Sequence, residues 1–93
     1  MFIIYSTPTC VYCDRAKTLL TSKGLEYQEI QLEQGQEKVK GTKYIAMESF
    51  KEMLPEAKTV PQIFYSTDVS YEYIGGFDDL KLYLDKLWLD PKP

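Results

Sequence analysis

The sequence predicts a single α/β domain in which helices flank a four-stranded mixed sheet. Three observations support this: a short apolar run opens the chain, an alternating run follows the first helical segment, and a hairpin pattern precedes a final amphipathic segment. The chain has 93 residues, the size of one small domain. We therefore expect residues 1–93 to fold as one unit.

The first third of the chain is typical of a strand, a helix and a second strand. Residues 2–6 (FIIYS) are apolar or β-forming without turn residues, as in a strand buried on both faces. The helix that follows has Thr9 as its candidate N-cap and Gly24 at its end. Residues 26–32 (EYQEIQL) alternate like a strand. Such a unit is right-handed, and its two strands are parallel.

The middle of the chain is less regular. Residues 33–44 are polar and contain glycines, so we expect a loop with isolated helical turns at most. A helix over about residues 45–54 would end at Pro55. Residues 59–66 and 70–74 are two β-forming runs around a turn, which predicts a hairpin.

The last segment predicts a helix that packs on the sheet. Asp78 and Asp79 lie in its first turn and Lys86 near its end, as the helix dipole favours. Its apolar stripe includes Leu80, Tyr83 and Leu84. The resulting element order, β-α-β-α-β-β-α, is that of a minimal thioredoxin-like fold.

Composition excludes several kinds of function. Fourteen acidic and eleven basic residues give a net charge of −3, which argues against nucleic acid as the main partner. No run approaches the ~18 apolar residues of a membrane span, and no basic signal-peptide segment opens the chain. The absence of histidine excludes Cys–His catalysis, and two thiols alone do not complete a usual zinc site. We expect a monomeric cytoplasmic protein without a metal.

The only two cysteines, Cys10 and Cys13, lie at the start of the first predicted helix. A disulfide across so short a loop removes little chain entropy, so stability alone does not explain the pair. Free N–H groups at the helix N-terminus favour a thiolate at Cys10, whereas Cys13, one turn later, should be shielded. An exposed thiolate can attack a disulfide, and the second thiol can resolve the product. The pattern predicts redox chemistry; an inert pair, or half of a metal site between two chains, is the alternative.

Four separated segments carry a family resemblance: YSTPTCVYC, CDRAKTLL, TVPQIF and GGFDDL. The sequence resembles the glutaredoxins, most closely small phage-type members with a C-V-Y-C motif. The resemblance implies a glutathione-dependent thiol–disulfide oxidoreductase that reduces protein disulfides or glutathione mixed disulfides, with ribonucleotide reductase as a natural protein partner. Cys10 would be the nucleophile and Cys13 the resolving cysteine. Glutathione would be a co-substrate, with no permanently bound cofactor.

The resemblance also implies a glutathione site. Its residues would be Tyr12, Thr59, Val60, Pro61, Gly75, Gly76, Phe77, Asp78 and Asp79. Pro61 would follow a cis peptide bond that places the Val60 backbone beside Cys10, where a substrate can pair like an added strand. At the start of the last helix, free N–H groups can bind a carboxylate, and an aspartate, preferably Asp78, can receive the γ-glutamyl ammonium. Without the resemblance, the aspartates would be ordinary helix caps.

Departures from the family pattern leave other functions open. Thr7 stands where the family often has a lysine, and Arg15, Lys51 or Lys58 could supply the missing charge. Thr7 also favours an alternative, a thioredoxin-like carrier reduced by a flavin reductase. A further alternative is a non-enzymatic iron–sulfur cluster carrier, in which two chains and two glutathiones share a cluster.

Overall fold

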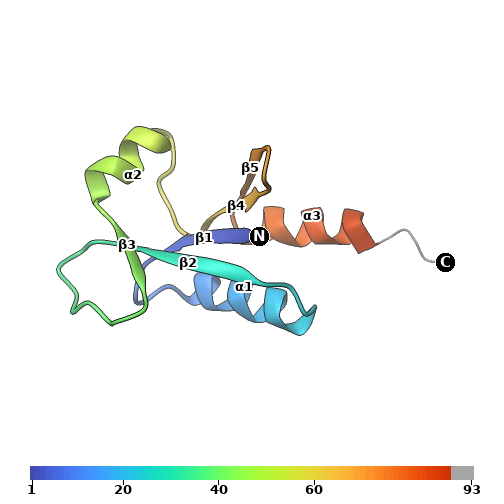
Figure 1. The fold of residues 1–93 in the computed structure, drawn as a ribbon, viewed down its shortest axis with the longest axis horizontal. Coiled ribbons are helices and arrows are strands. Elements are labelled where there is room, and N and C mark those ends of the chain that lie inside the picture. Colours follow the sequence, from blue (N-terminus) through green and yellow to red (C-terminus); the bar gives the residue numbers. More distant parts are fainter. Residues whose placement is uncertain (89–93) are drawn as a thin grey trace.

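The fold is a twisted sheet with helices on both faces (Figure 1). The computed structural model describes the backbone of residues 1–88 and the side chains of residues 1–86. The elements in chain order are β1 (Phe2–Ser6), α1 (Val11–Ser22), β2 (Tyr27–Leu32), β3 (Lys43–Ile45), α2 (Met47–Met53), β4 (Gln62–Ser66), β5 (Tyr71–Gly75) and α3 (Phe77–Trp88). No helix in this part of the chain combines the length and apolar composition needed to cross a membrane.

The strand order is β3-β2-β1-β4-β5. β1 is parallel to β2 and antiparallel to β4, and the β4–β5 pair is an antiparallel hairpin. The mixed sheet, the parallel first pair and the hairpin are therefore confirmed.

The prediction of four strands is wrong, because a fifth strand, β3, forms inside the stretch expected to be a loop. β3 lies parallel to β2, with Ile45 opposite Leu32. The three-residue strand is too short for an alternating pattern to reveal it, and it forms because β2 offers an unpaired outer edge. Since β3 takes up Lys43–Ile45, α2 begins later than expected, at Met47.

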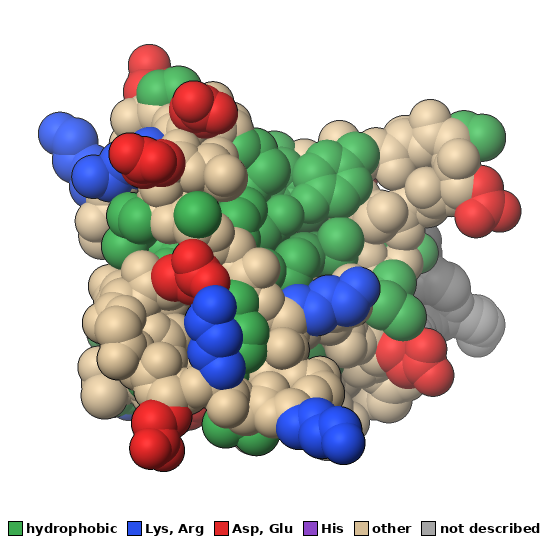
Figure 2. Space-filling model, turned by 60° about the vertical axis from the view of Figure 1, so that its left-hand side comes forward, with side chains coloured by type: hydrophobic (Ala, Val, Ile, Leu, Met, Phe, Trp, Pro, Cys, Tyr) green, Lys and Arg blue, Asp and Glu red, His purple; other side chains and the backbone are tan. Residues whose placement is uncertain are grey.

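One face of the sheet carries only α2, which has seven residues. Tyr5, Leu32, Phe50 and Phe64 form the buried cluster on this face. Tyr71 stacks on Phe64 with ring centroids 4.7 Å apart, yet the Tyr71 side chain remains 48% exposed to solvent. Figure 2, which brings the left-hand side of Figure 1 forward, shows hydrophobic side chains gathered in a hollow of the surface. A short α2 thus leaves apolar surface uncovered.

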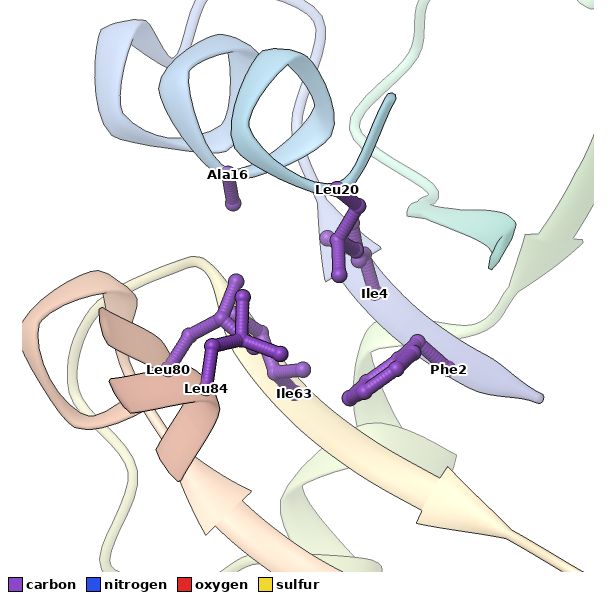
Figure 3. Packing of buried hydrophobic residues seen from close by; sticks show 7 residues of the cluster. All are labelled: Phe2, Ile4, Ala16, Leu20, Ile63, Leu80 and Leu84. Atoms are coloured by element: carbon purple, nitrogen blue, oxygen red, sulfur yellow. The ribbon is translucent and has the colours of Figure 1, made fainter. Parts of the chain in front are cut away.

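The opposite face carries α1 and α3, which contact each other as well as the sheet. Figure 3 shows how side chains from both helices meet those of β1 and β4. The buried cluster consists of Phe2, Ile4, Ala16, Leu20, Ile63, Leu80 and Leu84. Ile4 faces this cluster while Tyr5 faces the other, so β1 is buried on both faces, as its apolar run predicts. This core holds the N-termini of α1 and α3 at fixed positions relative to the strands.

Candidate active site

Cys10 is the N-cap residue of α1, with an extended backbone (φ −114°, ψ 110°). Its Sγ accepts a hydrogen bond of 3.1 Å from the backbone N–H of Cys13 and forms a disulfide with the Cys13 sulfur. The prediction that Thr9 is the N-cap is wrong, because Cys10 occupies that position and its sulfur takes the place of a capping hydroxyl. In the reduced protein, the same N–H and the helix dipole favour a thiolate on Cys10.

The two cysteines differ in exposure, as their spacing predicts. The Cys13 side chain is only 1% exposed, whereas Cys10 is half-buried. A substrate disulfide can therefore reach the Cys10 sulfur and not the Cys13 sulfur.

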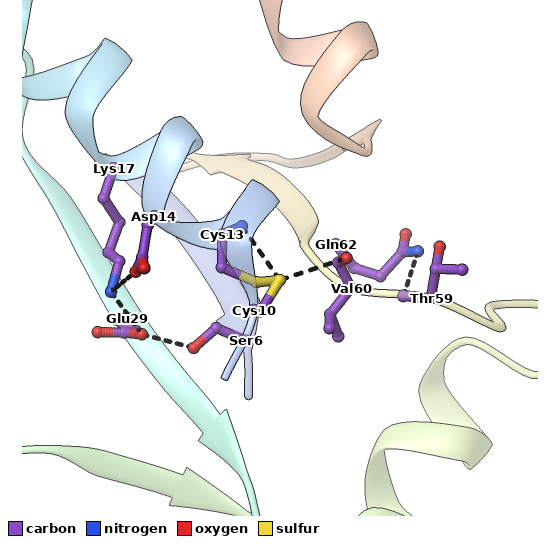
Figure 4. The surroundings of a disulfide bond; sticks show 9 residues. All are labelled: Ser6, Cys10, Cys13, Asp14, Lys17, Glu29, Thr59, Val60 and Gln62. Carbon is purple, nitrogen blue, oxygen red and sulfur yellow. Dashed lines mark hydrogen bonds and ion pairs between the residues drawn. A yellow bond between two sulfur atoms is a disulfide. The ribbon is translucent and has the colours of Figure 1, made fainter. Parts of the chain in front are cut away.

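The loop before β4 lies beside the Cys10 sulfur (Figure 4). The Val60–Pro61 peptide bond is cis, as the resemblance implies. The carbonyl oxygen of Val60 lies 3.6 Å from Cys10 Sγ. The side-chain amide of Gln62 donates a 2.8 Å hydrogen bond to the Thr59 carbonyl and so holds the loop. The backbone of the loop that precedes β4 thus borders the reactive sulfur.

A groove of about 380 Å³ runs from this loop to the N-terminus of α3. It is lined by Tyr12, Thr59, Val60, Pro61, Gly76, Phe77, Asp78 and Asp79. The residues assigned to a glutathione site from the sequence therefore come together, with Gly75 as the exception. Gly75 lies buried behind the groove with a φ of +123°, against the Asp79 carboxylate.

The two aspartates of this segment differ in their partners. Asp79 Oδ2 accepts a 3.0 Å hydrogen bond from the Gly76 N–H, so this third residue of α3 reaches back to the residue before the helix, as the acidic side chain of a capping box does. Asp78 is exposed and makes no hydrogen bond or ion pair within the described residues. Asp78 is therefore the carboxylate that can meet a cation in the groove.

The structure separates the three cations proposed to replace a lysine at Thr7. Lys51 and Lys58 line the same second groove as Thr7, next to Val60. Arg15 instead lies over the Tyr12 ring, 5.1 Å from its centroid.

Sequence reasoning missed a polar cluster between α1, the end of β1 and the middle of β2. The buried Ser6 hydroxyl donates a 2.6 Å hydrogen bond to Glu29, and Lys17 Nζ lies 3.1 Å from the same oxygen (Figure 4). Lys17 also lies 3.4 Å from Asp14. Burial lowers the pKa of Lys17, but the hydrogen bonds and charges of Glu29 and then Asp14 outweigh it, so that pKa is raised. The only sequence signal was the Asp14–Lys17 spacing on one helix face.

A thioredoxin-like fold with a C-x-x-C disulfide at a helix N-terminus, one sulfur accessible and one buried, defines a thiol–disulfide oxidoreductase. Within that class, the chain belongs to the glutaredoxin family, whose family model matches residues 2–69.

The chain is similar to several members along most of its length. Glutaredoxin 3 of Escherichia coli K12 is 38% identical over 90 residues, which cover 95% of this chain and 90% of that protein. Glutaredoxin 1 of Rickettsia bellii is 37% identical over 78 residues, covering 84% and 70%. Among solved structures, glutaredoxin from Brucella melitensis superposes with a TM-score of 0.55 at 30% identity, covering 91% of this chain and 78% of that one. Glutaredoxin 1 from Francisella tularensis, in complex with cacodylate, shares the fold, with a TM-score of 0.63 at 23% identity and 96% of each chain covered.

Proposed function

We propose that the protein takes its electrons from glutathione and uses them to reduce protein disulfides and glutathione mixed disulfides. The observation that carries this proposal is the groove between the loop before β4 and α3, with Asp78 open at one end and, at the other, the Val60 backbone, whose carbonyl lies beside Cys10 Sγ. Glutathione is a small extended peptide with charges at both ends, which suits a narrow groove with polar termini.

In the proposed cycle, the Cys10 thiolate attacks one sulfur of a substrate disulfide. A Cys10–substrate disulfide forms, and the other substrate sulfur leaves as a thiolate. Cys13 then gives its proton to the departing sulfur and attacks the Cys10 sulfur, which closes the Cys10–Cys13 disulfide and releases the substrate thiol. One glutathione thiolate attacks the Cys10 sulfur of this disulfide, which forms a Cys10–glutathione disulfide and frees Cys13. A second glutathione thiolate then attacks the bound glutathione sulfur, which releases glutathione disulfide and restores the Cys10 thiolate. Two electrons thus pass from two glutathiones to one substrate disulfide.

The groove suggests an orientation for glutathione. The γ-glutamyl ammonium would meet Asp78, and its α-carboxylate would meet the N–H groups at the start of α3. The cysteinyl residue would pair with the backbone of Val60, which directs its sulfur at Cys10. The glycyl carboxylate would then point across Val60 toward Lys51 and Lys58, which compensate for Thr7.

The first experiment follows NADPH consumption with the oxidised protein in two reducing systems. We expect rapid reduction by glutathione with glutathione reductase, and none by thioredoxin reductase alone. The reverse result would establish the thioredoxin-like alternative that Thr7 favours, and it would leave the aspartates of α3 as helix caps only.

Variants of the cysteines test the assigned roles. Cys10→Ser should abolish all turnover, while Cys13→Ser should keep reduction of glutathione mixed disulfides, because that reaction needs one thiol. Asp78→Asn should raise the KM for glutathione by up to about tenfold, since one charge-assisted contact is lost. Ordinary turnover by Cys10→Ser would overturn the mechanism.

Three finer assignments also belong to the proposal. Val11 between the cysteines supports a phage-type glutaredoxin, and ribonucleotide reductase would be its protein substrate. A redox pair that must return to the dithiol state suits the reducing cytoplasm. Reduction of a ribonucleotide reductase in a coupled assay would test the substrate directly.

A further inference from the structure

A second groove, which we call the α2 groove, meets the first one beside the reactive sulfur. Its volume is about 410 Å³, and Thr59 and Val60 line both grooves. Because the Val60 carbonyl lies 3.6 Å from Cys10 Sγ, a peptide paired with Val60 would continue from one groove into the other.

The α2 groove is mainly apolar along its walls. Its apolar side chains are Leu32, Met47, Phe50, Ala57 and Val60. In the orientation proposed above, only the glycyl residue of glutathione would reach this groove, and glycine has no side chain to place against such walls. The apolar surface is therefore unexplained by glutathione and suits a larger apolar side chain at the same position.

Two cations border the apolar walls. Lys51 and Lys58 line the α2 groove and are exposed, and neither forms an ion pair within the part of the chain that the structure describes. Among the residues that the structure describes, no acidic side chain lines the groove. In a protein with a net charge of −3, this is a local positive site that attracts a carboxylate.

We propose that the α2 groove binds the residues that directly follow the reactive cysteine of a protein substrate. The preferred sequence is a large apolar residue and then an acidic residue or the C-terminal carboxylate. The apolar side chain packs between Met47 and Ala57, and the carboxylate meets Lys51 or Lys58. This assignment rests on the proposed function, since the substrate cysteine must lie at Val60 for Cys10 to attack it.

The test compares symmetric disulfides of two peptides with identical composition, acetyl-Gly-Gly-Cys-Leu-Glu-amide and acetyl-Glu-Leu-Cys-Gly-Gly-amide. The pre-reduced protein is mixed with each, and the second-order rate constant of reduction is measured. We expect the peptide with Leu-Glu after the cysteine to react about tenfold faster, because burial of a leucine side chain is worth at least that factor. Equal rate constants, or no reduction of either peptide, would overturn the proposal.

Charge reversal tests the two lysines. In wild type, the Leu-Glu peptide should react faster than its Leu-Lys counterpart, and in the Lys51→Glu/Lys58→Glu variant this order should reverse. Lys40→Glu is the matched control, because Lys40 is an exposed lysine of the 33–42 loop outside both grooves, and it should keep the wild-type order. An unchanged order in the double variant would contradict the assignment.

Glutathione turnover with bis(2-hydroxyethyl) disulfide is measured on the wild-type preparation used for the peptides, since Lys51 and Lys58 are themselves assigned to glutathione. If the protein turns over with glutathione but reduces both peptides at the same rate, the α2 groove assignment is refuted and the proposed function stays intact. Absent glutathione turnover with the expected peptide preference would refute glutathione dependence and leave the groove assignment standing.

Discussion

Gly75→Ala should destabilise the protein strongly, because two separate effects meet at this residue. Gly75 has a φ of +123°, a backbone region used almost only by glycine, which costs alanine about 1–3 kcal/mol. A Cβ there would also lie 2.8 Å from Asp79 Cγ and 2.9 Å from Asp79 Cβ, so the aspartate must move. Moving it breaks the hydrogen bond from the Gly76 N–H, which is worth about 1 kcal/mol as a cap. The free energy of unfolding should fall by about 2–4 kcal/mol, or roughly 10–30 °C in Tm.

Urea denaturation followed by circular dichroism measures this loss, and two comparisons isolate its cause. Gly76→Ala is the matched control, since its nearest foreign atom, the Pro61 oxygen, is 3.7 Å from the added Cβ; we expect a loss below about 1 kcal/mol. Asp79→Ala should cost less in the Gly75→Ala background than in wild type, because the cap is already lost there. A Gly75→Ala protein as stable as wild type, or fully additive losses, would refute the reasoning.

Two further predictions concern buried polar groups. Glu29→Gln should lower the free energy of unfolding by about 1–2 kcal/mol at pH 7, because Lys17 and Ser6 lose a charged partner. The pKa of Lys17 is raised above 10.5, so the stability difference between wild type and Glu29→Gln should keep its whole size below that pH and vanish as Lys17 deprotonates. Urea titrations at neutral and alkaline pH measure this change. Burial, with the hydrogen bond and charge of Tyr71, raises the pKa of Tyr5, so its ionisation opposes folding. Wild type should therefore lose stability relative to Tyr5→Phe above pH 10, and parallel alkaline unfolding curves would contradict this.

The parts of the site that depend on local spacing could be predicted from the sequence. One cysteine lies at a helix start and the second lies three residues later, on the inner face of the helix. This local spacing alone predicts which sulfur is exposed. The glycine–aspartate segment likewise predicts a helix start with free N–H groups. Which aspartate accepts the Gly76 N–H depends on the path of the backbone through Gly75, whose φ is positive, so only the structure could separate Asp78 from Asp79.

The features that were missed depend on pairing between distant segments. β3 forms because β2 has a free edge, and the residues Lys43–Ile45 by themselves do not indicate that such an edge is available. Glu29 meets Ser6 and Lys17 only once β2 lies beside β1 and α1 covers both, which the strand pattern alone does not specify. The same holds for the α2 groove, whose walls come from β2, α2 and the loop before β4.

The capping role of Cys10 couples the stability of the fold to its redox state. A thiolate accepts the Cys13 N–H more strongly than a sulfur already bonded to another sulfur, so the cap stabilises the reduced protein more than the oxidised one. By thermodynamic linkage, every 1.4 kcal/mol of such preference raises the reduction potential of the pair by about 30 mV. The first turn of α1 thus helps to set the reduction potential. Any change that strengthens the hydrogen bond to the Cys10 thiolate makes the protein a better oxidant and a weaker reductant.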